Sequence, residues 1–299
     1  MTDVTGLPPA AAEAPSRFAA DAAFARAITE LAGRLLFERY ERVEAIDHKS
    51  PKDVVTEVDH LSEAMILGAI REAFPDDGIL AEESGAHHAA GPAPASGPRG
   101  ADAAASVARA LASGRTWIVD PLDGTINYAN GIPYFCVSVG LVVDGRPAAG
   151  AVCDPMRDET FWAAADGPAM LGDRVIHASS KELLTDYVVS LALGGRAIAT
   201  RARAVRQAVR ASRNTGSAAL ALSYVANGRF DAFLQSGGMS AWDVAAAGLI
   251  AERGGAVVTD AHGGPWFDVD KATRQFGIVA SPALHYPELL RRSREAPAG

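Results

Sequence analysis

An apolar strand of this chain runs directly into two carboxylates. Residues 117–125 read Trp-Ile-Val-Asp-Pro-Leu-Asp-Gly-Thr, so Asp120 and Asp123 end the strand three residues apart. Pro121 stiffens the turn and restricts the directions in which the acids point. An acid that abuts a buried strand needs a partner. Two convergent carboxylates beside free backbone N–H groups suit a divalent cation together with a phosphate.

Three further acids lie at the ends of predicted elements. Asp59 precedes a helix predicted at 61–74, Glu82 follows a strand predicted at 78–81, and Asp243 opens a helix predicted at 241–253. Taken singly, each has a purely structural explanation. Asp59 could cap its helix, Glu82 could belong to a solvated turn, and Asp243 could simply favour the helix dipole.

Taken together, these acids favour a site for hard cations. Neighbouring carboxylates repel each other by on the order of 4 kcal/mol per pair at an effective dielectric constant of about 20, and divalent cations can neutralise such a cluster. Mg²⁺ takes oxygen ligands and shares its shell with water and phosphate oxygens. Two or three Mg²⁺ ions would polarise a phosphate, generate a hydroxide nucleophile and stabilise the leaving oxygen.

Composition narrows the class of protein. With 299 residues, 48% hydrophobic and 21% charged, the chain is typical of a soluble globular protein, and its net charge of −8 argues against nucleic-acid binding. Cys136 and Cys153 lie in apolar runs, which predicts buried free thiols in a reducing compartment. No apolar run is long enough to span a membrane, and residues 1–15 do not resemble a signal peptide. We therefore expect a cytoplasmic protein with no membrane partner.

The periodicity predicts a layered α/β (α+β) protein. Further helices are expected at 16–42, 201–211, 217–226 and 287–292, and further strands at 135–143, 148–153, 159–164, 188–193, 230–234, 256–259 and 277–280. Asp144 and Gly145 predict a hairpin turn. Residues 86–115 are rich in Ala, Gly, Pro and Ser and form a predicted surface insertion, with a short helix at 103–111. We expect an N-terminal sub-domain, 1–185, that carries most metal ligands, and a C-terminal one, 186–299, that completes the site.

Four blocks of the chain resemble the signature blocks of the inositol monophosphatase family. They are residues 53–59 (Asp-Val-Val-Thr-Glu-Val-Asp), 80–84 (Leu-Ala-Glu-Glu-Ser), 117–125 and 242–246 (Trp-Asp-Val-Ala-Ala), in the order that the family shows. The resemblance runs from about residue 18 to 290. It implies the αβαβα sandwich of the inositol monophosphatase and fructose-1,6-bisphosphatase type, in a superfamily of Mg²⁺-dependent, lithium-sensitive phosphatases. It also implies a homodimer.

The resemblance assigns roles position by position. It implies metal ligation by the carboxylates of Glu82, Asp120, Asp123 and Asp243 and by the carbonyl of Leu122. Thr125 and Asp59 would form a hydrogen-bonded pair that, with Glu82, orients and deprotonates the attacking water. The N–H groups of Gly124 and Thr125 would bind the phosphate. The implied contacts to the rest of the substrate come from Asp123, Gly216, Ser217, Ser236 and Asp243.

One position departs from the family pattern. Seven residues before Asp243, many inositol-specific members carry a glutamate that binds ring hydroxyls, and this chain has Ser236. We predict a Mg²⁺-dependent phosphomonoesterase that hydrolyses a small polyol or sugar-type phosphate by attack of metal-activated water. Inositol 1-phosphate is the first candidate, and the substitution keeps histidinol phosphate, 3′-phosphoadenosine 5′-phosphate and fructose 1,6-bisphosphate open.

The sequence also bears on a covalent mechanism and on a role without catalysis. Phosphatases with a nucleophilic aspartate place their second acid two residues away, whereas here the spacing is three with an intervening proline, which disfavours a covalent intermediate. A catalytically silent family member that binds a protein partner is the alternative from outside the enzymes. The presence of every expected type of metal ligand argues against such a loss of catalytic activity.

Overall fold

The computed structural model describes residues 16–42, 46–50, 53–88, 114–195, 198–268, 271 and 274–294. The described helices are α1 (Ala19–Arg39), α2 (Glu57–Ala73), α4 (Thr125–Ala129), α5 (Ile198–Arg206), α6 (Ala218–Ser223), α7 (Ala241–Arg253) and α8 (Tyr286–Arg294), with 3₁₀ turns at Leu184–Asp186 and Tyr224–Asn227. The described strands are β1 (Ile46–Ser50), β2 (Asp53–Thr56), β3 (Gly78–Ala81), β4 (Gly85–His88), β5 (Arg115–Asp123), β6 (Cys136–Val143), β7 (Arg146–Asp154), β8 (Glu159–Ala164), β9 (Met170–Leu171), β10 (Arg174–Val175), β11 (Val188–Ala192), β12 (Ala211–Arg213), β13 (Ala232–Met239), β14 (Val257–Asp260) and β15 (Phe276–Ser281).

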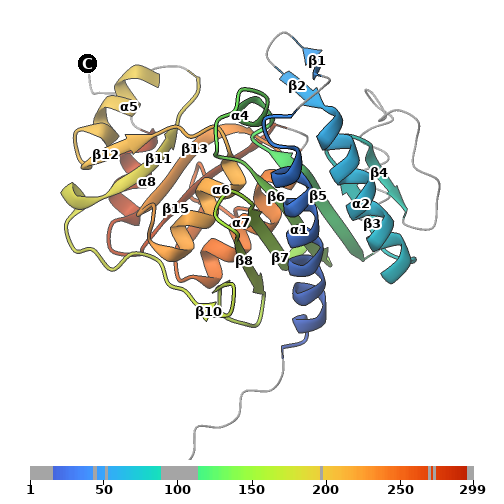
Figure 1. Cartoon of the computed structure of the whole chain (residues 1–299). Helices are drawn as coiled ribbons and strands as arrows, with labels where there is room; N and C mark the ends of the chain where they lie inside the picture. The colour runs from blue at the N-terminus through green and yellow to red at the C-terminus, as the bar shows by residue number, and fades with distance from the viewer. Residues whose placement is uncertain are drawn as a thin grey trace, which may run out of the picture.

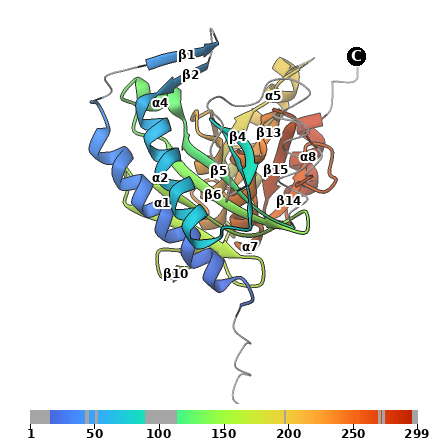
Figure 2. The ribbon, with the colours of Figure 1, turned by 90° about the vertical axis from the view of Figure 1, so that its right-hand side faces the viewer.

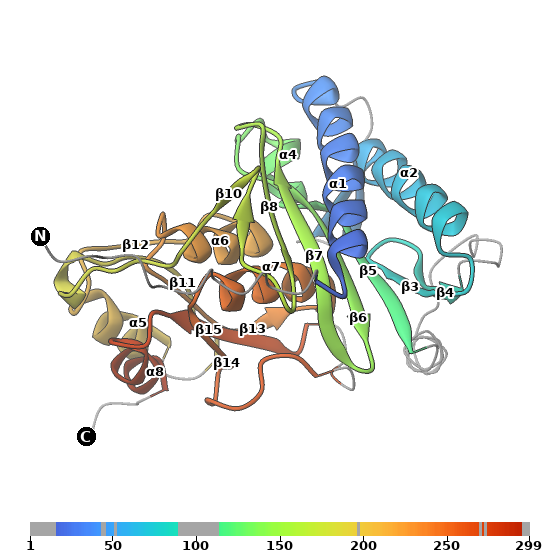
Figure 3. The ribbon, with the colours of Figure 1, turned by 90° about the horizontal axis from the view of Figure 1, so that it is seen from below.

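Helices and sheets alternate in layers, which confirms the predicted αβαβα sandwich (Figures 1 and 3). Helices α1 and α2 cover the outer face of an eight-stranded sheet with the order β10-β9-β8-β7-β6-β5-β3-β4. Helices α6 and α7 lie between this sheet and a five-stranded one, β12-β11-β13-β15-β14. Helices α5 and α8 cover the far face of the second sheet. Figure 2 shows α1 and α2 side by side, with the β1–β2 hairpin beyond their ends.

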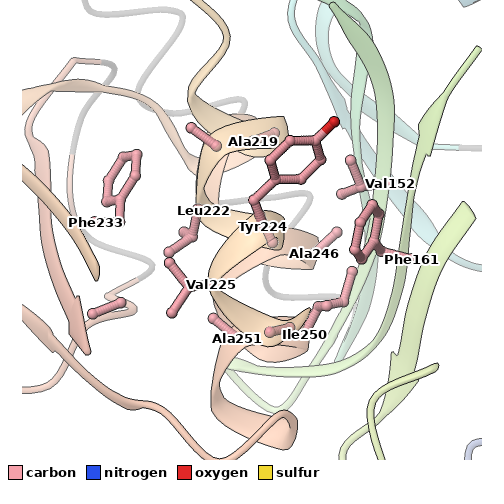
Figure 4. Packing of buried hydrophobic residues seen from close by; sticks show 14 of the residues in the cluster. Val152, Phe161, Ala219, Leu222, Tyr224, Val225, Phe233, Ala246, Ile250 and Ala251 are labelled. Atoms are coloured by element: carbon pink, nitrogen blue, oxygen red, sulfur yellow. The ribbon is translucent and has the colours of Figure 1, made fainter. Parts of the chain in front are cut away.

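The central helices form the largest apolar core. Val152 and Phe161 of the eight-stranded sheet face them from one side, and Phe233 of the five-stranded sheet faces them from the other (Figure 4). Leu222 and Ile250 lie between, with exposed fractions of 0%. Because residues of both sheets share this cluster, the two halves of the chain are tightly coupled, and the boundary at 185/186 stays a prediction.

Helix α7 approaches the large sheet closely because two strands present glycine to it. A Cβ atom added at Gly150 of β7 would lie 2.8 Å from the Cα of Ala246, and one at Gly140 of β6 would lie 3.0 Å from the amide nitrogen of the same alanine. The alanine-rich face of α7 therefore packs onto bare backbone. This contact sets the distance between α7 and the strands that carry the acids.

Most predicted elements are present, and the differences have local causes. Asp144 and Gly145, both with positive φ (49° and 76°), form the predicted turn between β6 and β7. Helix α2 begins at Glu57, earlier than predicted, because the Thr56 hydroxyl accepts the Val58 N–H at 3.2 Å and starts the helix there.

Other predictions differ from the structure or concern residues that it does not describe. The helix predicted at 201–211 ends at Arg206, and the chain then adds β12 parallel to β11. Helix α4 was not predicted. The predicted insertion at 86–115 begins and ends within strands β4 and β5, while the helix predicted at 103–111 lies outside the described residues. Both cysteines are buried and free, as predicted. Within the described residues, no helix combines the length and the hydropathy that a membrane span requires.

Candidate active site

Three carboxylates from two elements meet between the eight-stranded sheet and α7. Asp120 and Asp123 come from β5, Asp243 comes from the first turn of α7, and one oxygen of each lies within 4.8 Å of the others. In a regular strand, residues three apart point to opposite faces. The pairing of β5 with β6 shifts register between Asp120 and Asp123, and this irregularity lets both acids face the same point.

The start of α7 fixes the third acid. The backbone N–H of Ser240 donates to Oδ2 of Asp243 at 2.5 Å, as part of a capping box. Helix α7 has the bounds predicted for it. The structural explanation of Asp243 as a first-turn acid is therefore correct, and the same residue also faces the other two carboxylates.

The environment of the cluster strongly disfavours three bare charges. Asp120 is 1% exposed, and burial together with the charges of Glu82, Asp123 and Asp243 raises its pKa well above the usual value. Burial and the charge of Asp123 likewise raise the pKa of Asp243 well above its usual value. Buried, mutually repelling carboxylate oxygens are a donor set that suits a hard divalent cation. The residues present therefore fit Mg²⁺.

Hydrogen bonds from the C-terminal half of the chain orient Asp123. The hydroxyl of Ser217 donates to Oδ2 of Asp123 at 2.6 Å, and the backbone N–H of Ala219 donates to the same oxygen at 2.7 Å. Ser217 is 2% exposed, so its side chain acts on the carboxylate. Burial raises the pKa of Asp123, and these donors lower it. The thiol of Cys136 lies 3.8 Å from the same oxygen.

Glu82 lies beside this group of three rather than within it. Its backbone N–H donates to the carbonyl of Val119 at 3.1 Å, which continues the pairing of β3 with β5. The turn that it begins is held by Glu63 of α2, which accepts the N–H groups of Glu83 at 2.9 Å and Ser84 at 3.0 Å. The charge of Glu82 reaches Asp120 and Asp243, as its effect on the pKa of both acids shows.

Asp59 and Thr125, far apart in the chain, lie together beside the cluster. The hydroxyl of Thr125 lies 3.1 Å from Oδ1 of Asp59 and 3.0 Å from the carbonyl of Leu122, and it has one proton to donate between them. Thr56 donates to Oδ2 of Asp59 from its backbone at 2.8 Å and from its hydroxyl at 2.6 Å. Burial raises the pKa of Asp59 to about 6, although these hydrogen bonds oppose the shift. Asp59 is residue N3 of helix α2 in a capping box, and the N-cap is Thr56.

The turn after Asp123 requires glycine. Gly124 has a φ of 99°, and a Cβ atom there would lie 3.1 Å from the carbonyl oxygen of Tyr134. The N–H of Leu122 donates to Oδ1 of Asp120 at 3.1 Å. These contacts fix the backbone of Leu122, Gly124 and Thr125 next to the carboxylates.

A cavity of about 260 Å³ opens beside the cluster. Its lining includes Asp123, Asp243, Gly216 and Ser217. The amide of Asn127 holds one wall, because it donates to the carbonyls of Tyr134 at 2.7 Å and Thr215 at 2.8 Å. Ser236, which is expected to contact the alcohol part of the substrate, does not line this cavity, and its hydroxyl accepts the N–H of Gly194 at 2.7 Å.

Sequence reasoning missed two positioning residues, Glu63 and Asn127. Glu63 lies one turn after Asp59 on the same face of α2, so helical spacing offered a weak signal. Asn127 offered none, because the carbonyl of Thr215 that it holds lies 88 residues away.

Comparisons with known proteins identify the family to which this sequence and this fold belong. The model of the inositol monophosphatase family matches residues 19–298. The Nus factor SuhB of Haemophilus influenzae is 34% identical over 271 residues, which cover 88% of this chain and 91% of that protein. Inositol monophosphatase 2 of Solanum lycopersicum is 35% identical over 239 residues, which cover 78% of this chain and 84% of that protein. The crystal structure of the extragenic suppressor protein SuhB from Bartonella henselae is similar with a TM-score of 0.79 and 30% identity, covering 93% of this chain and 100% of that one. This chain belongs to the inositol monophosphatase family.

Proposed function

We propose that this protein is a Mg²⁺-dependent phosphomonoesterase that acts on a small polyol or sugar-type phosphate. The observation that carries the proposal is the meeting of Asp120, Asp123 and Asp243 within 4.8 Å, beside a cavity that Asp123 and Asp243 line. Family membership supports phosphatase chemistry on a phosphate ester. A homodimer and a cytoplasmic location stay predictions.

The proposed metal ligands are the carboxylates of Glu82, Asp120, Asp123 and Asp243 and the carbonyl of Leu122. When bound, Mg²⁺ would neutralise the acids, polarise the phosphoryl group and acidify the attacking water. Ser217 and Ala219 hold Asp123 in position, and Glu63 holds the turn that begins with Glu82. Two or three ions is the number that the cluster of acids suggests.

Asp59 and Thr125 are proposed to move the proton. The hydroxyl of Thr125 donates toward Oδ1 of Asp59 over 3.1 Å, so its lone pairs are available to accept a hydrogen bond from water. Through Thr125, the proton of the attacking water can pass to Asp59 as the new P–O bond forms. A pKa of about 6 suits Asp59 to this task, because it is ionised at neutral pH yet basic enough to accept a proton. Glu82 orients the same water in this proposal.

The phosphate and the alcohol are proposed to bind on different sides of the cluster. The backbone N–H groups of Gly124 and Thr125 bind phosphate oxygens. The alcohol occupies the cavity of about 260 Å³, against Gly216 and the faces of Asp123 and Asp243. Ser217 lines the same cavity, and its hydroxyl also donates to Asp123 and so orients that carboxylate toward the substrate.

A phosphate-release panel with and without EDTA tests the proposal. Inositol 1-phosphate leads the panel because a relative 35% identical is named an inositol monophosphatase. Histidinol phosphate, 3′-phosphoadenosine 5′-phosphate and fructose 1,6-bisphosphate complete it. We expect turnover that EDTA abolishes and Mg²⁺ restores. Turnover that survives EDTA, or release from none of the substrates, would overturn the proposal.

The name of one relative favours a second candidate function. A protein 34% identical to this chain is called a Nus factor, which points to a binding role in that protein. We propose as the alternative that this chain, too, binds a macromolecular partner independently of catalysis. If this alternative holds, the Asp120→Asn variant should complement a strain that lacks the protein. Failure of that variant where the unaltered protein succeeds would reject the alternative.

A further inference from the structure

A second cavity, of about 700 Å³, adjoins the candidate active site. Gln235 and Gly238 of β13 line both cavities. The second cavity extends from there past the end of β11, at Gly194, toward α5 and α8. A ligand held at the carboxylate cluster could therefore extend into it around the ends of two neighbouring strands.

The second cavity is basic, although the chain as a whole has a net charge of −8. Its charged lining comes from Arg201 of α5 and Arg294 of α8, and no acid lines it in the described part of the chain. Arg201 donates to the carbonyls of Gly194 and Ser293, and Arg294 donates to the carbonyl of His262. Neutral carbonyls thus hold both guanidinium groups in place without cancelling their charge.

Small residues leave the junction between the cavities open. A Cβ atom added at Gly237 or Gly238 would meet no atom within 4 Å. Ser236 contributes a short side chain to the second cavity, and its hydroxyl is engaged by the N–H of Gly194. A carboxylate at position 236 would have placed a negative charge in this cavity. The neutral side chain of Ser236 does not offset the positive charges of Arg201 and Arg294.

We propose that the second cavity binds an additional anionic group on the alcohol part of the substrate. The substrate class is then a phosphate ester that carries a second phosphate or a carboxylate. This inference rests on the proposed phosphatase function and selects among its candidates. It favours bisphosphates and disfavours histidinol phosphate, whose amine would meet two arginines.

Two matched substrate pairs test this preference. Fructose 1,6-bisphosphate is compared with fructose 1-phosphate, and 2-phosphoglycerate with glycerol 2-phosphate, so that the second anion is a phosphate in one pair and a carboxylate in the other. We expect kcat/KM to be at least about tenfold higher for the member with the second anionic group, in one pair or in both. Equal values within both pairs would overturn the inference while leaving the phosphatase proposal intact.

Charge-removing variants locate the effect. Arg201→Gln and Arg294→Gln should each lower the ratio of kcat/KM between the paired substrates by roughly tenfold. The matched control is Arg203→Gln, an exposed arginine of the same helix that does not line the cavity, and it should leave the ratio unchanged. Two variants are needed because Arg201 also bridges backbone carbonyls. An unchanged ratio in both would refute the assignment.

A charge-adding pair tests the same site from the opposite direction. Ser236→Glu should lower the ratio more than Ser236→Gln does, and because the two side chains are similar in size, the difference between the variants reports the added charge. Binding gives a readout that needs no turnover. The affinity for fructose 1,6-bisphosphate, measured by calorimetric titration with Ca²⁺ in place of Mg²⁺, should be about tenfold lower in Arg201→Gln. If no substrate of the panel were hydrolysed, this titration would still decide the inference. Affinities equal to those for fructose 1-phosphate would reject it.

Discussion

Asp120 is the residue on which the proposed chemistry most depends. Its carboxylate is buried among three other acids, and burial and their charges raise its pKa. Asp120→Asn keeps the shape and removes one negative charge. We expect kcat/KM to fall by about 10²- to 10³-fold. Without metal, the variant should melt at or above the temperature of the unaltered protein, because a repulsive buried charge is gone.

A matched variant separates this effect from general damage. Asp173→Asn alters an aspartate whose side chain is 89% exposed and far from the cluster in sequence, and its activity should stay unchanged. Circular dichroism checks that both variants fold. Near-normal turnover in Asp120→Asn would contradict its assignment as a ligand.

Asp59 should set the acidic limb of the pH profile. Burial favours the neutral acid, so its pKa lies at about 6, above the usual value. Below that pH, Asp59 is protonated and cannot accept a proton through Thr125. At saturating Mg²⁺, kcat/KM should therefore fall toward low pH, by about tenfold per pH unit once the pH lies below the pKa of Asp59, and nearby bound cations should shift that pKa below its metal-free value. Asp59→Asn should be nearly inactive, and its residual activity should lack this acidic limb; a limb that persists in the variant would exclude Asp59 as the base.

At this scale, the sequence predicted residue types better than contacts. Asp120 and Asp123 stood out because strand, proline and glycine lie next to them in the chain. The contact between Asp59 and Thr125 spans 66 residues, and only the family resemblance suggested it. The contact of Ser217 with the substrate stays a prediction, and the hydrogen bond from its hydroxyl to Asp123 was not predicted. Which partner a hydroxyl chooses depends on packing between distant segments, and no local pattern encodes that.

Elements with strong local signals were predicted closely. Strand β8 and helix α7 have the predicted bounds, because a polar turn or a capping serine limits each one. The end of α5 was wrong, since the following residues join β11 as a parallel strand. Parallel pairing is set by a partner elsewhere in the chain, so helical periodicity alone extended that helix too far.

The contact between α7 and the large sheet predicts that Gly→Ala substitutions at two positions have opposite effects on stability. Gly150→Ala would place a methyl group 2.8 Å from the Cα of Ala246, and α7 would have to move. We expect a loss of about 1–3 kcal/mol in the free energy of unfolding. Gly68→Ala, in the exposed part of α2 with no atom within 4 Å, should instead stabilise by about 0.4–1 kcal/mol.

Denaturant unfolding of both variants checks this pair. Because α7 carries Asp243, the shift caused by Gly150→Ala should also lower phosphatase activity, while Gly68→Ala should leave activity unchanged. Equal stability of the two variants would show that α7 does not depend on the bare backbone of β7.

On the scale of the whole molecule, the layers divide the work of the site. The eight-stranded sheet supplies Asp120 and Asp123, the central layer supplies Asp243, and α2 supplies Asp59. The loop before α6 then joins the two sheets through Ser217 and Asp123. No single element contains a complete site, and the acids come together only when the sandwich is packed. Metal binding and global folding should therefore be coupled.

This coupling predicts a metal-dependent melting temperature. Mg²⁺ at about 100 times its dissociation constant should stabilise the fold by about 2.7 kcal/mol, which corresponds to a rise of roughly 5 °C. EDTA should reverse the rise, and Na⁺ at equal ionic strength should not reproduce it, because screening alone acts weakly on buried pairs. In Asp120→Asn the rise should shrink while the metal-free melting temperature does not fall. A Mg²⁺ shift of equal size in both proteins would place the ion away from the cluster, since stabilisation at this site requires that carboxylate.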